Sequence, residues 1–274
     1  MNGVLFSCDE DNDVYFCKIE SFTNELKEKL RSRLAAICEG EYDSTRLGDT
    51  YSYYNTLDTF IDRINGKKLD TKKGMVGELI CHLLITEYLD DFTCASPFFN
   101  LEERNIKKGH DLVYYRKKTN DVWAVEVKSG ENGKDPKDST TLTLNLLGRA
   151  HSGISDKLDK VEKNIWRNAL KGLHTVIGPG VTKNKIEKIL SGYKAIAQTG
   201  EHEPTNYNVM LSSVLFNDIN DDVDFDQLLT WKIGNEIDED YGSCIVFSFH
   251  KNTYQAVIDF IEEELKLHSP SGAA

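Results

Sequence analysis

The amino-acid sequence predicts an α/β fold in which a mixed β-sheet is flanked by helices. Segments whose apolar residues recur every three or four positions, as in helices, alternate with short runs of β-branched and aromatic residues, as in strands. Such interleaving favours an α/β architecture. Hydrophobic residues make up 39% of the 274 residues, which is enough to form a full core.

Apolar periodicity places three strands and three helices in the first hundred residues. They are strands at 3–8, 13–19 and 94–99 and helices at 22–38, 54–64 and 74–90. Residues 41–53 are polar and are expected to form a loop, and residues 67–73 form a basic connector. The helix at 74–90 is apolar almost all round, so we expect neighbours on more than one side of it.

The same criteria assign the rest of the chain. They give strands at 110–116, 122–128, 208–216 and 243–249 and helices at roughly 153–171, after Gly178-Pro179-Gly180, and at 253–267. Residues 129–140 have the composition of a loop, and the tail 269–274 is expected to be disordered. The acidic segment 218–240 is interpreted either as a solvated loop or as a docking or autoinhibitory surface that repels DNA.

The formal net charge is −12, which excludes a wholly basic coat protein for nucleic acid. Residues 61–200 carry 24 basic and 18 acidic side chains, a net charge of +6, and the two flanks together carry −18. A polyanion would therefore meet the middle of the chain, unless the asymmetry is accidental and the charges are only solvated faces.

The sequence also bears on the compartment. No apolar run reaches 18 residues, and the N-terminus is acidic rather than basic, so we expect neither a membrane span nor a signal peptide. The expected location is cytoplasmic. The six cysteines are scattered without a Cys-x-x-Cys motif, which predicts buried thiols rather than disulfides or a zinc site.

Charged residues interrupt the predicted strand at 122–128. Glu126 and Lys128 are two positions apart, so both side chains point to the same face. On a buried strand they need partners, because an unpaired buried charge destabilises the core. The alternative is a surface ion pair on an edge strand, which would suffice for an isolated Glu-x-Lys.

The preceding strand begins with Asp111, and a short basic turn joins the two strands. Antiparallel pairing would bring Asp111 near Glu126, although the sequence does not determine the register. Two carboxylates and the backbone carbonyl of Val127 would form a set of hard oxygen ligands, which suits Mg²⁺ or Mn²⁺ rather than zinc. Lys128 would then orient or deprotonate a water molecule or offset charge on a phosphate.

Glu78 lies one turn before His82 on the apolar helix at 74–90. Taken alone, Glu78 would hydrogen-bond a loop and His82 would be a satisfied core histidine. Gly77-Glu78, however, precedes Gly109-His110-Asp111 and Glu126-Val127-Lys128 along the chain. Together they form a motif with a glutamate on a helix, an aspartate on a strand, and Glu-x-Lys on the next strand.

This motif resembles the PD-(D/E)XK nuclease superfamily, whose fold is restriction-endonuclease-like. The resemblance covers about residues 74–171 and departs from the pattern at His110, where the superfamily loosely keeps a proline. It implies a helix-strand-strand-strand-helix core, a divalent metal on Asp111 and Glu126, Lys128 assisting the nucleophilic water, and Glu78 as an accessory acid. By that resemblance, residues 67–268 form the nuclease domain, with a C-terminal α/β extension, and 1–66 an N-terminal α/β extension packed on it.

The overall layout is also similar to HamA, the nuclease-subunit family of the Hachiman antiphage system. That resemblance implies antiphage defence and a superfamily-2 helicase partner. No Walker-type phosphate loop occurs in the chain, so any ATP dependence would come from such a partner.

Basic side chains in the middle of the chain are candidates for contacts with DNA phosphates. The candidates are Lys107, Lys108, Arg116, Lys117, Lys118, Lys134, Lys137 and Arg149, followed by Lys157, Lys160 and Lys163 along the next helix. Each of them taken singly is equally compatible with an ordinary solvated side chain.

The sequence therefore predicts a Mg²⁺-dependent deoxyribonuclease. A non-catalytic, partner-binding module on the same fold is the main alternative, and it would tolerate replacement of Asp111, Glu126 and Lys128. A hydrolase of small phosphates is a third interpretation, which would turn over nucleotides without shortening DNA.

Overall fold

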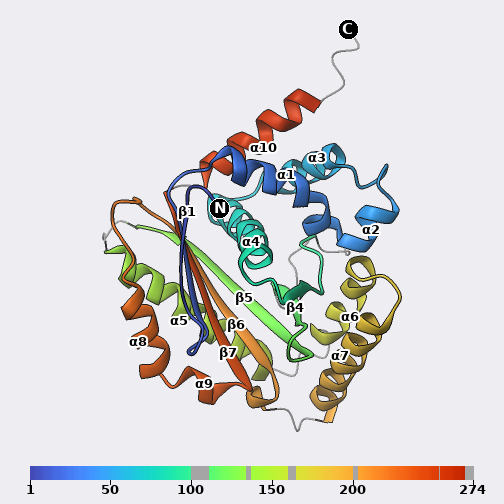
Figure 1. Ribbon diagram of the computed structural model, residues 1–274, viewed down its shortest axis with the longest axis vertical. Coiled ribbons are helices and arrows are strands. Elements are labelled where there is room, and N and C mark those ends of the chain that lie inside the picture. The colour runs from blue at the N-terminus through green and yellow to red at the C-terminus, as the bar shows by residue number, and fades with distance from the viewer. Residues whose placement is uncertain (100–110, 134–136, 160–164, 200–202, 253, 269–274) are drawn as a thin grey trace.

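The computed structural model describes residues 1–99, 111–133, 137–159, 165–199, 203–252 and 254–268. At its centre is a seven-stranded mixed sheet with helices on both faces (Figure 1), which confirms the predicted fold class. The strands are β1 (Val4–Asp9), β2 (Val14–Ile19), β3 (Phe92–Cys94), β4 (Leu112–Arg116), β5 (Asp121–Glu131), β6 (Asn208–Phe216) and β7 (Ser243–Lys251).

The order of the strands across the sheet is β1-β2-β7-β6-β5-β4-β3. The four strands β2, β7, β6 and β5 run parallel to one another. Antiparallel pairings close both sides, β1 with β2 on one side and β5-β4-β3 on the other. The N-terminal hairpin and the C-terminal strand thus belong to the same sheet as the candidate site.

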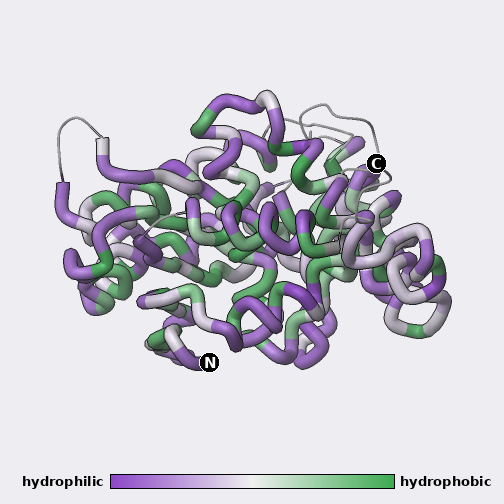
Figure 2. Tube along the Cα trace, turned by 90° about the horizontal axis from the view of Figure 1, so that it is seen from above, coloured by the Kyte–Doolittle hydropathy of each residue, from purple (hydrophilic) through white to green (hydrophobic). Residues whose placement is uncertain are grey.

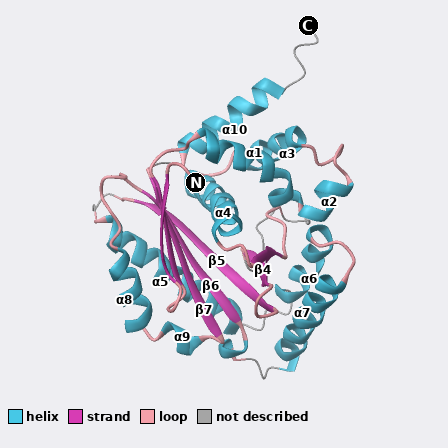
Figure 3. Cartoon of the chain, in the orientation of Figure 1, coloured by secondary structure: helices cyan, strands magenta, loops and turns pink. Residues whose placement is uncertain are grey.

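The helices alternate with these strands (Figure 3). They are α1 (Asn24–Glu39), α2 (Glu41–Arg46), α3 (Tyr53–Ile64), α4 (Leu69–Tyr88), α5 (Ser139–Asp159), α6 (Ile165–Val176), α7 (Val181–Thr199), the 3₁₀ turn η1 (Pro204–Asn206), α8 (Phe225–Gly234), α9 (Ile237–Asp240) and α10 (Gln255–His268). The chain order α4-β3-β4-β5-α5 is the helix-strand-strand-strand-helix order that the resemblance implies.

Two hydrophobic clusters fill the spaces between the layers. Buried side chains of α1, α3, α4 and α10 pack on one face of the sheet, and those of α5 to α9 pack on the other. Single helices alternate between hydrophobic and hydrophilic stretches along the trace (Figure 2), as elements with one buried side do. None of the described helices is long and apolar enough to cross a membrane.

Successive side chains on β5 point to opposite faces of the sheet, and this alternation decides which of them enter the site. Trp123, Val125 and Val127 belong to the cluster beneath α4, whereas Val122 and Ala124 belong to the cluster beneath α5. Glu126 and Lys128 continue the second set, so both face α5.

Several boundaries differ from the sequence-based predictions. Residues 41–46 form α2 instead of a loop, and α4 begins at Leu69, inside the expected connector. The first turns of α4 are polar, but Lys73 is buried and ion-paired with Glu131, so a tertiary contact extends the helix. The strand expected at 94–99 is only the short β3.

The region expected to form one helix at 153–171 contains two helices. α5 begins at Ser139 and α6 at Ile165, and residues 160–164 between them lie outside the described part. β5 also runs three residues further than expected, to Glu131. Asp138 caps α5 by accepting the N–H of Thr141, a local signal within the expected loop, and Asp221 adds a long-range contact by accepting from both the N–H and the hydroxyl of Ser139.

The acidic segment 218–240 contains α8 and α9, so its interpretation as a solvated loop is wrong for these residues. Asp224 caps α8 by accepting the N–H groups of Asp226 and Gln227. Leu228 and Lys232 are buried. The six cysteines are all free; Cys17, Cys38, Cys81 and Cys244 are buried as expected, whereas Cys8 is exposed and Cys94 is partly buried. The tail 269–274 lies outside the described residues.

Lys251, at the end of β7, provides a test of this packing. Its side chain is buried, its Nζ lies 5.2 Å from the centre of the Phe22 ring, and burial lowers its pKa to about 8. Above pH 8 the unfolded chain binds this proton more tightly than the folded protein does, so the contribution of Lys251 to stability rises with pH.

We compare the unfolding free energies of wild type and Lys251→Met. The difference, wild type minus variant, should increase by on the order of 1 kcal/mol between pH 8 and 9.5. Urea denaturation at both pH values measures it. The buried thiols and tyrosines contribute equally to the two proteins, so they cancel. A difference that is flat or falls with pH would contradict the assigned burial of the ammonium group.

Candidate functional site

Asp111 directly precedes β4 and lies beside β5. One of its carboxylate oxygens, Oδ2, accepts a hydrogen bond of 2.8 Å from the backbone N–H of Val127. The register Leu112↔Val125 explains this contact, because continuing the antiparallel ladder by one residue reaches Glu126. The N–H and C=O of one strand residue face the same neighbour, so the carbonyl of Val127 also faces the side of Asp111.

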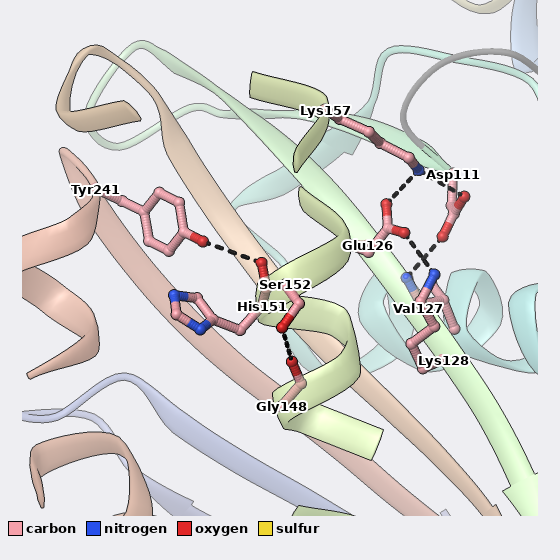
Figure 4. Close-up of polar contacts among 9 residues, drawn as sticks. All are labelled: Asp111, Glu126, Val127, Lys128, Gly148, His151, Ser152, Lys157 and Tyr241. Carbon is pink, nitrogen blue, oxygen red and sulfur yellow. Dashed lines mark hydrogen bonds and ion pairs between the residues drawn. The ribbon is translucent and has the colours of Figure 1, made fainter. Parts of the chain in front are cut away.

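Glu126 forms the floor of the site, with only 1% of its side chain exposed. Lys128 Nζ donates to Glu126 Oε1 at 2.6 Å, and Lys157 Nζ contacts Glu126 Oε2. Figure 4 shows the two ammonium groups on opposite sides of this carboxylate. The surface ion pair considered as an alternative for Glu126 and Lys128 is therefore wrong, because the carboxylate is buried on an inner strand.

Lys157 comes from the last turn of α5 and reaches both carboxylates. Its Nζ lies 3.5 Å from Asp111 Oδ1 and is also ion-paired with Glu126. The sequence suggested Lys157 only as a phosphate contact on a solvated face. The signal that would have placed it inward is its spacing of three from Ile154, which is buried against the sheet.

The charges in this group depend on one another. Burial raises the pKa of Glu126, and the neighbouring charge of Asp111 raises it further, while Lys157 and Lys128 act to lower it. Burial also acts to lower the pKa of Lys157, but the two carboxylates outweigh burial and raise it above the ordinary lysine value. Lys157 is therefore a stable ammonium ion between two carboxyl groups.

Gly153 allows α5 to approach the site closely. A Cβ atom at this position would lie 3.0 Å from Glu126 Oε1 and 3.5 Å from Lys128 Nζ. The helix backbone thus passes directly over the Glu126–Lys128 pair, and a side chain at position 153 would press on it. Gly153 is a second site residue that the sequence pattern did not single out.

Glu78 lies on α4, on the other side of the sheet. The negative charges of Glu78 and Asp111 both add to the effect of burial in raising the pKa of the Cys81 thiol, so both carboxylates lie near Cys81. Within the described residues, however, no group of three or more Asp, Glu, His or Cys side chains is arranged to hold a metal ion. The oxygen atoms that the structure brings together here are those of the Asp111 and Glu126 carboxylates, beside the backbone of Val127.

His82 is a core residue with hydrogen-bonding partners, as expected for this histidine taken alone. Its Nδ1 lies 2.9 Å from the Tyr114 hydroxyl and its Nε2 lies 3.0 Å from Cys94 Sγ. Burial raises the pKa of Tyr114 well above its usual value, so the hydroxyl remains protonated and shares a hydrogen bond with Nδ1. These contacts join α4 to β3 and β4, the elements beside Asp111.

Among the described residues, the basic side chains proposed to contact DNA do not form one surface around the carboxylates. Arg116, Lys117 and Lys118 lie at the opposite end of the β4–β5 hairpin from Asp111, and Arg116 is ion-paired with Asp91 at 2.8 Å. Lys137 and Arg149 are exposed before and on α5. Lys107, Lys108 and Lys134 lie outside the described residues, as do Lys160 and Lys163.

The chain matches a known protein family. The model of this family, described as HamA, matches residues 4–265, a range that runs from β1 into α10 and includes every described strand of the sheet. A search of curated proteins finds no match to the sequence.

Proposed function

Because the chain belongs to the HamA family and is a component of a Hachiman antiphage system, we propose that it is a metal-dependent nuclease that hydrolyses phosphodiester bonds in DNA. The observation that carries this proposal is the group Asp111, Glu126, Lys128 and Lys157, in which a buried carboxylate is held between two lysines beside a second carboxylate. Buried ion pairs contribute little net stability, and strongly perturbed charges in contact with solvent are typical of functional sites.

The residues present fit Mg²⁺ or Mn²⁺. Asp111, Glu126 and the carbonyl of Val127 are hard oxygen donors, and the ammonium of Lys157 already spans the two carboxylates as a cation would. Mg²⁺ is commonly held by only one or two carboxylates, with water and substrate phosphates filling the other positions. When bound, the ion would stabilise negative charge on the phosphate and ease deprotonation of the attacking water.

Lys128 acts on the substrate side of this group. Its side chain is 28% exposed, whereas the glutamate that holds it is buried, so its position is fixed while its ammonium remains accessible. A fixed positive charge at this place would orient the water or offset the charge that develops on the phosphate. Glu78, across the sheet, would support the site without touching the substrate.

DNA would reach the site with help from a partner. The net charge of −18 on the flanks repels phosphates, and the basic candidates Lys137 and Arg149 offer only a few exposed contacts near α5. We therefore propose a superfamily-2 helicase as the partner that delivers DNA. Lys107, Lys108, Arg116, Lys117, Lys118 and Lys134 remain proposed phosphate contacts.

The test is cleavage of supercoiled plasmid, linear duplex, single-stranded DNA and RNA with Mg²⁺, Mn²⁺ or EDTA, by the chain alone and with its helicase partner. We expect DNA to be nicked or shortened only when the metal is present. Release of phosphate from nucleotides with intact DNA would favour a hydrolase of small phosphates. No cleavage under any of these conditions, with the partner present, would favour the non-catalytic binding module.

Lys128→Met should reduce metal-dependent cleavage by about 100-fold or more, because it removes the fixed positive charge beside the reacting phosphate. Mn²⁺ affinity, measured by calorimetry, should not weaken, since no ligand is lost. The matched control is Lys188→Met, which removes one exposed lysine from α7, away from the carboxylates. Equal cleavage by Lys128→Met and wild type would remove Lys128 from the catalytic group.

A further inference from the structure

We propose that Lys157 is an internal latch, whose ammonium group occupies the divalent-cation position between Asp111 and Glu126 in the resting protein. A metal ion would gain full access to the two carboxylates only after the last turn of α5 moves and withdraws this charge. The inference rests on the proposed function and adds to it a means of restraint built into the nuclease domain.

The contacts favour a latch over a phosphate contact. Lys157 lies against Glu126 Oε2 and at 3.5 Å from Asp111 Oδ1, so its charge is directed at the carboxylates. Its side chain is 26% exposed, compared with 1% for Glu126, so solvent reaches Lys157 more readily than it reaches the carboxylate. A cation approaching Glu126 from solvent would meet the positive charge of Lys157.

Lys128 does not play the same part. Its ammonium donates to Glu126 Oε1, so it is fixed on one side of that carboxylate. Lys157 comes from a different element and bridges two carboxylates. Withdrawal of α5 would therefore remove Lys157 from the site and leave Lys128 in place on β5.

The position of α5 is itself maintained by contacts on its outer side. Ser155 Oγ lies 2.7 Å from the Tyr241 hydroxyl, and His151 Nε2 lies 2.9 Å from Asp240 Oδ2. Figure 4 shows Tyr241 and His151 on the side of α5 away from the carboxylates. The latch thus belongs to a helix held between the site and the acidic segment, so a displacement of that segment would be transmitted to Lys157.

The experiment measures Mn²⁺ binding to the full chain by calorimetry and by water-proton relaxation, without DNA. Lys157→Met should bind Mn²⁺ about tenfold or more tightly than wild type, because a competing positive charge is removed. Lys157→Arg keeps the charge and should bind weakly, like wild type. Lys188→Met controls for the change in net charge.

Thermal unfolding provides the second readout. In EDTA, Lys157→Met should melt below wild type, because the two carboxylates have lost a shared counter-ion. Saturating Mn²⁺ should then raise its melting temperature by more than that of wild type, since tighter binding to the folded state stabilises it more. This comparison remains informative when the metal-free variant is unstable.

The outcomes separate the latch from the nuclease itself. Tight Mn²⁺ binding by wild type that Lys157→Met does not improve, and that Glu126→Gln removes, would overturn the latch and leave the metal site. Weaker binding by Lys157→Met than by wild type would overturn the latch and make Lys157 a positioning residue for the ligands. No binding by any variant would overturn both the latch and the metal-dependent function.

Discussion

Glu126→Gln is expected to abolish metal-dependent DNA cleavage, with a loss of about 1,000-fold or more, while the protein remains folded. The amide has the shape of the carboxylate but carries no negative charge, so it neither holds a divalent cation nor balances Lys128 and Lys157. Both lysines are more than a quarter exposed, so water solvates them after the change. We therefore expect the variant to fold.

The measurement pairs plasmid cleavage in Mg²⁺ with thermal unfolding and Mn²⁺ calorimetry. Glu20→Gln is the matched control, because it removes the same charge from an exposed position beyond β2. We expect Glu20→Gln to behave as wild type in all three measurements. Cleavage at the wild-type rate by Glu126→Gln would show that the active site lies elsewhere in the chain.

Gly77→Ala is expected to destabilise the protein by about 1–3 kcal/mol, the usual cost of overpacking a core. A Cβ at Gly77 would lie 2.0 Å from Ser129 Oγ, 3.1 Å from Ser129 Cβ and 3.3 Å from Val214 Cγ2. Rotation of the serine hydroxyl relieves only the first of these contacts. The other two require α4 to move away from β5 and β6, and Glu78 would move with it.

Gly74→Ala is the control on the same helix, since a Cβ there has no neighbour within 4 Å. It should be neutral or stabilise the protein by up to about 1 kcal/mol, the gain expected for alanine over glycine in a helix. Urea denaturation measures both variants, and Ser129→Ala added to Gly77→Ala should recover part of the loss. Equal unfolding free energies for the two single variants would contradict the close approach of α4 to β5.

Much of the site was predictable because its signals are local. The period of two along β5 placed Glu126 and Lys128 on one face, and the short connection to β4 brought Asp111 beside them. The strand β6 was predicted with its observed bounds, because an apolar run interrupted only by Ser212 and Ser213 marks a strand that is buried on both faces. The mixed sheet followed from the order of such elements along the chain.

Other elements depend on partners distant in sequence. The polar start of α4 is helical because Lys73 pairs with Glu131, and the first residue of α5, Ser139, is held by Asp221 in addition to the local cap from Asp138. α8 was missed for a different reason. The abundance of acidic residues suggested a loop, although Asp224 followed by an apolar residue every few positions is a recognisable helix start.

The sequence by itself determined the α/β class, the strands that form the centre of the sheet, and the identity of the Asp111, Glu126 and Lys128 group. These follow from periodicity and short connections, in which each residue's surroundings are set by its near neighbours. Only the tertiary structure decided that Lys157 lies between the two carboxylates and that Gly153 passes over them. Lys157 is 31 residues from Glu126 and 46 from Asp111, so its position depends on how α5 packs across the sheet. That packing is the sum of many weak contacts, which no local pattern encodes.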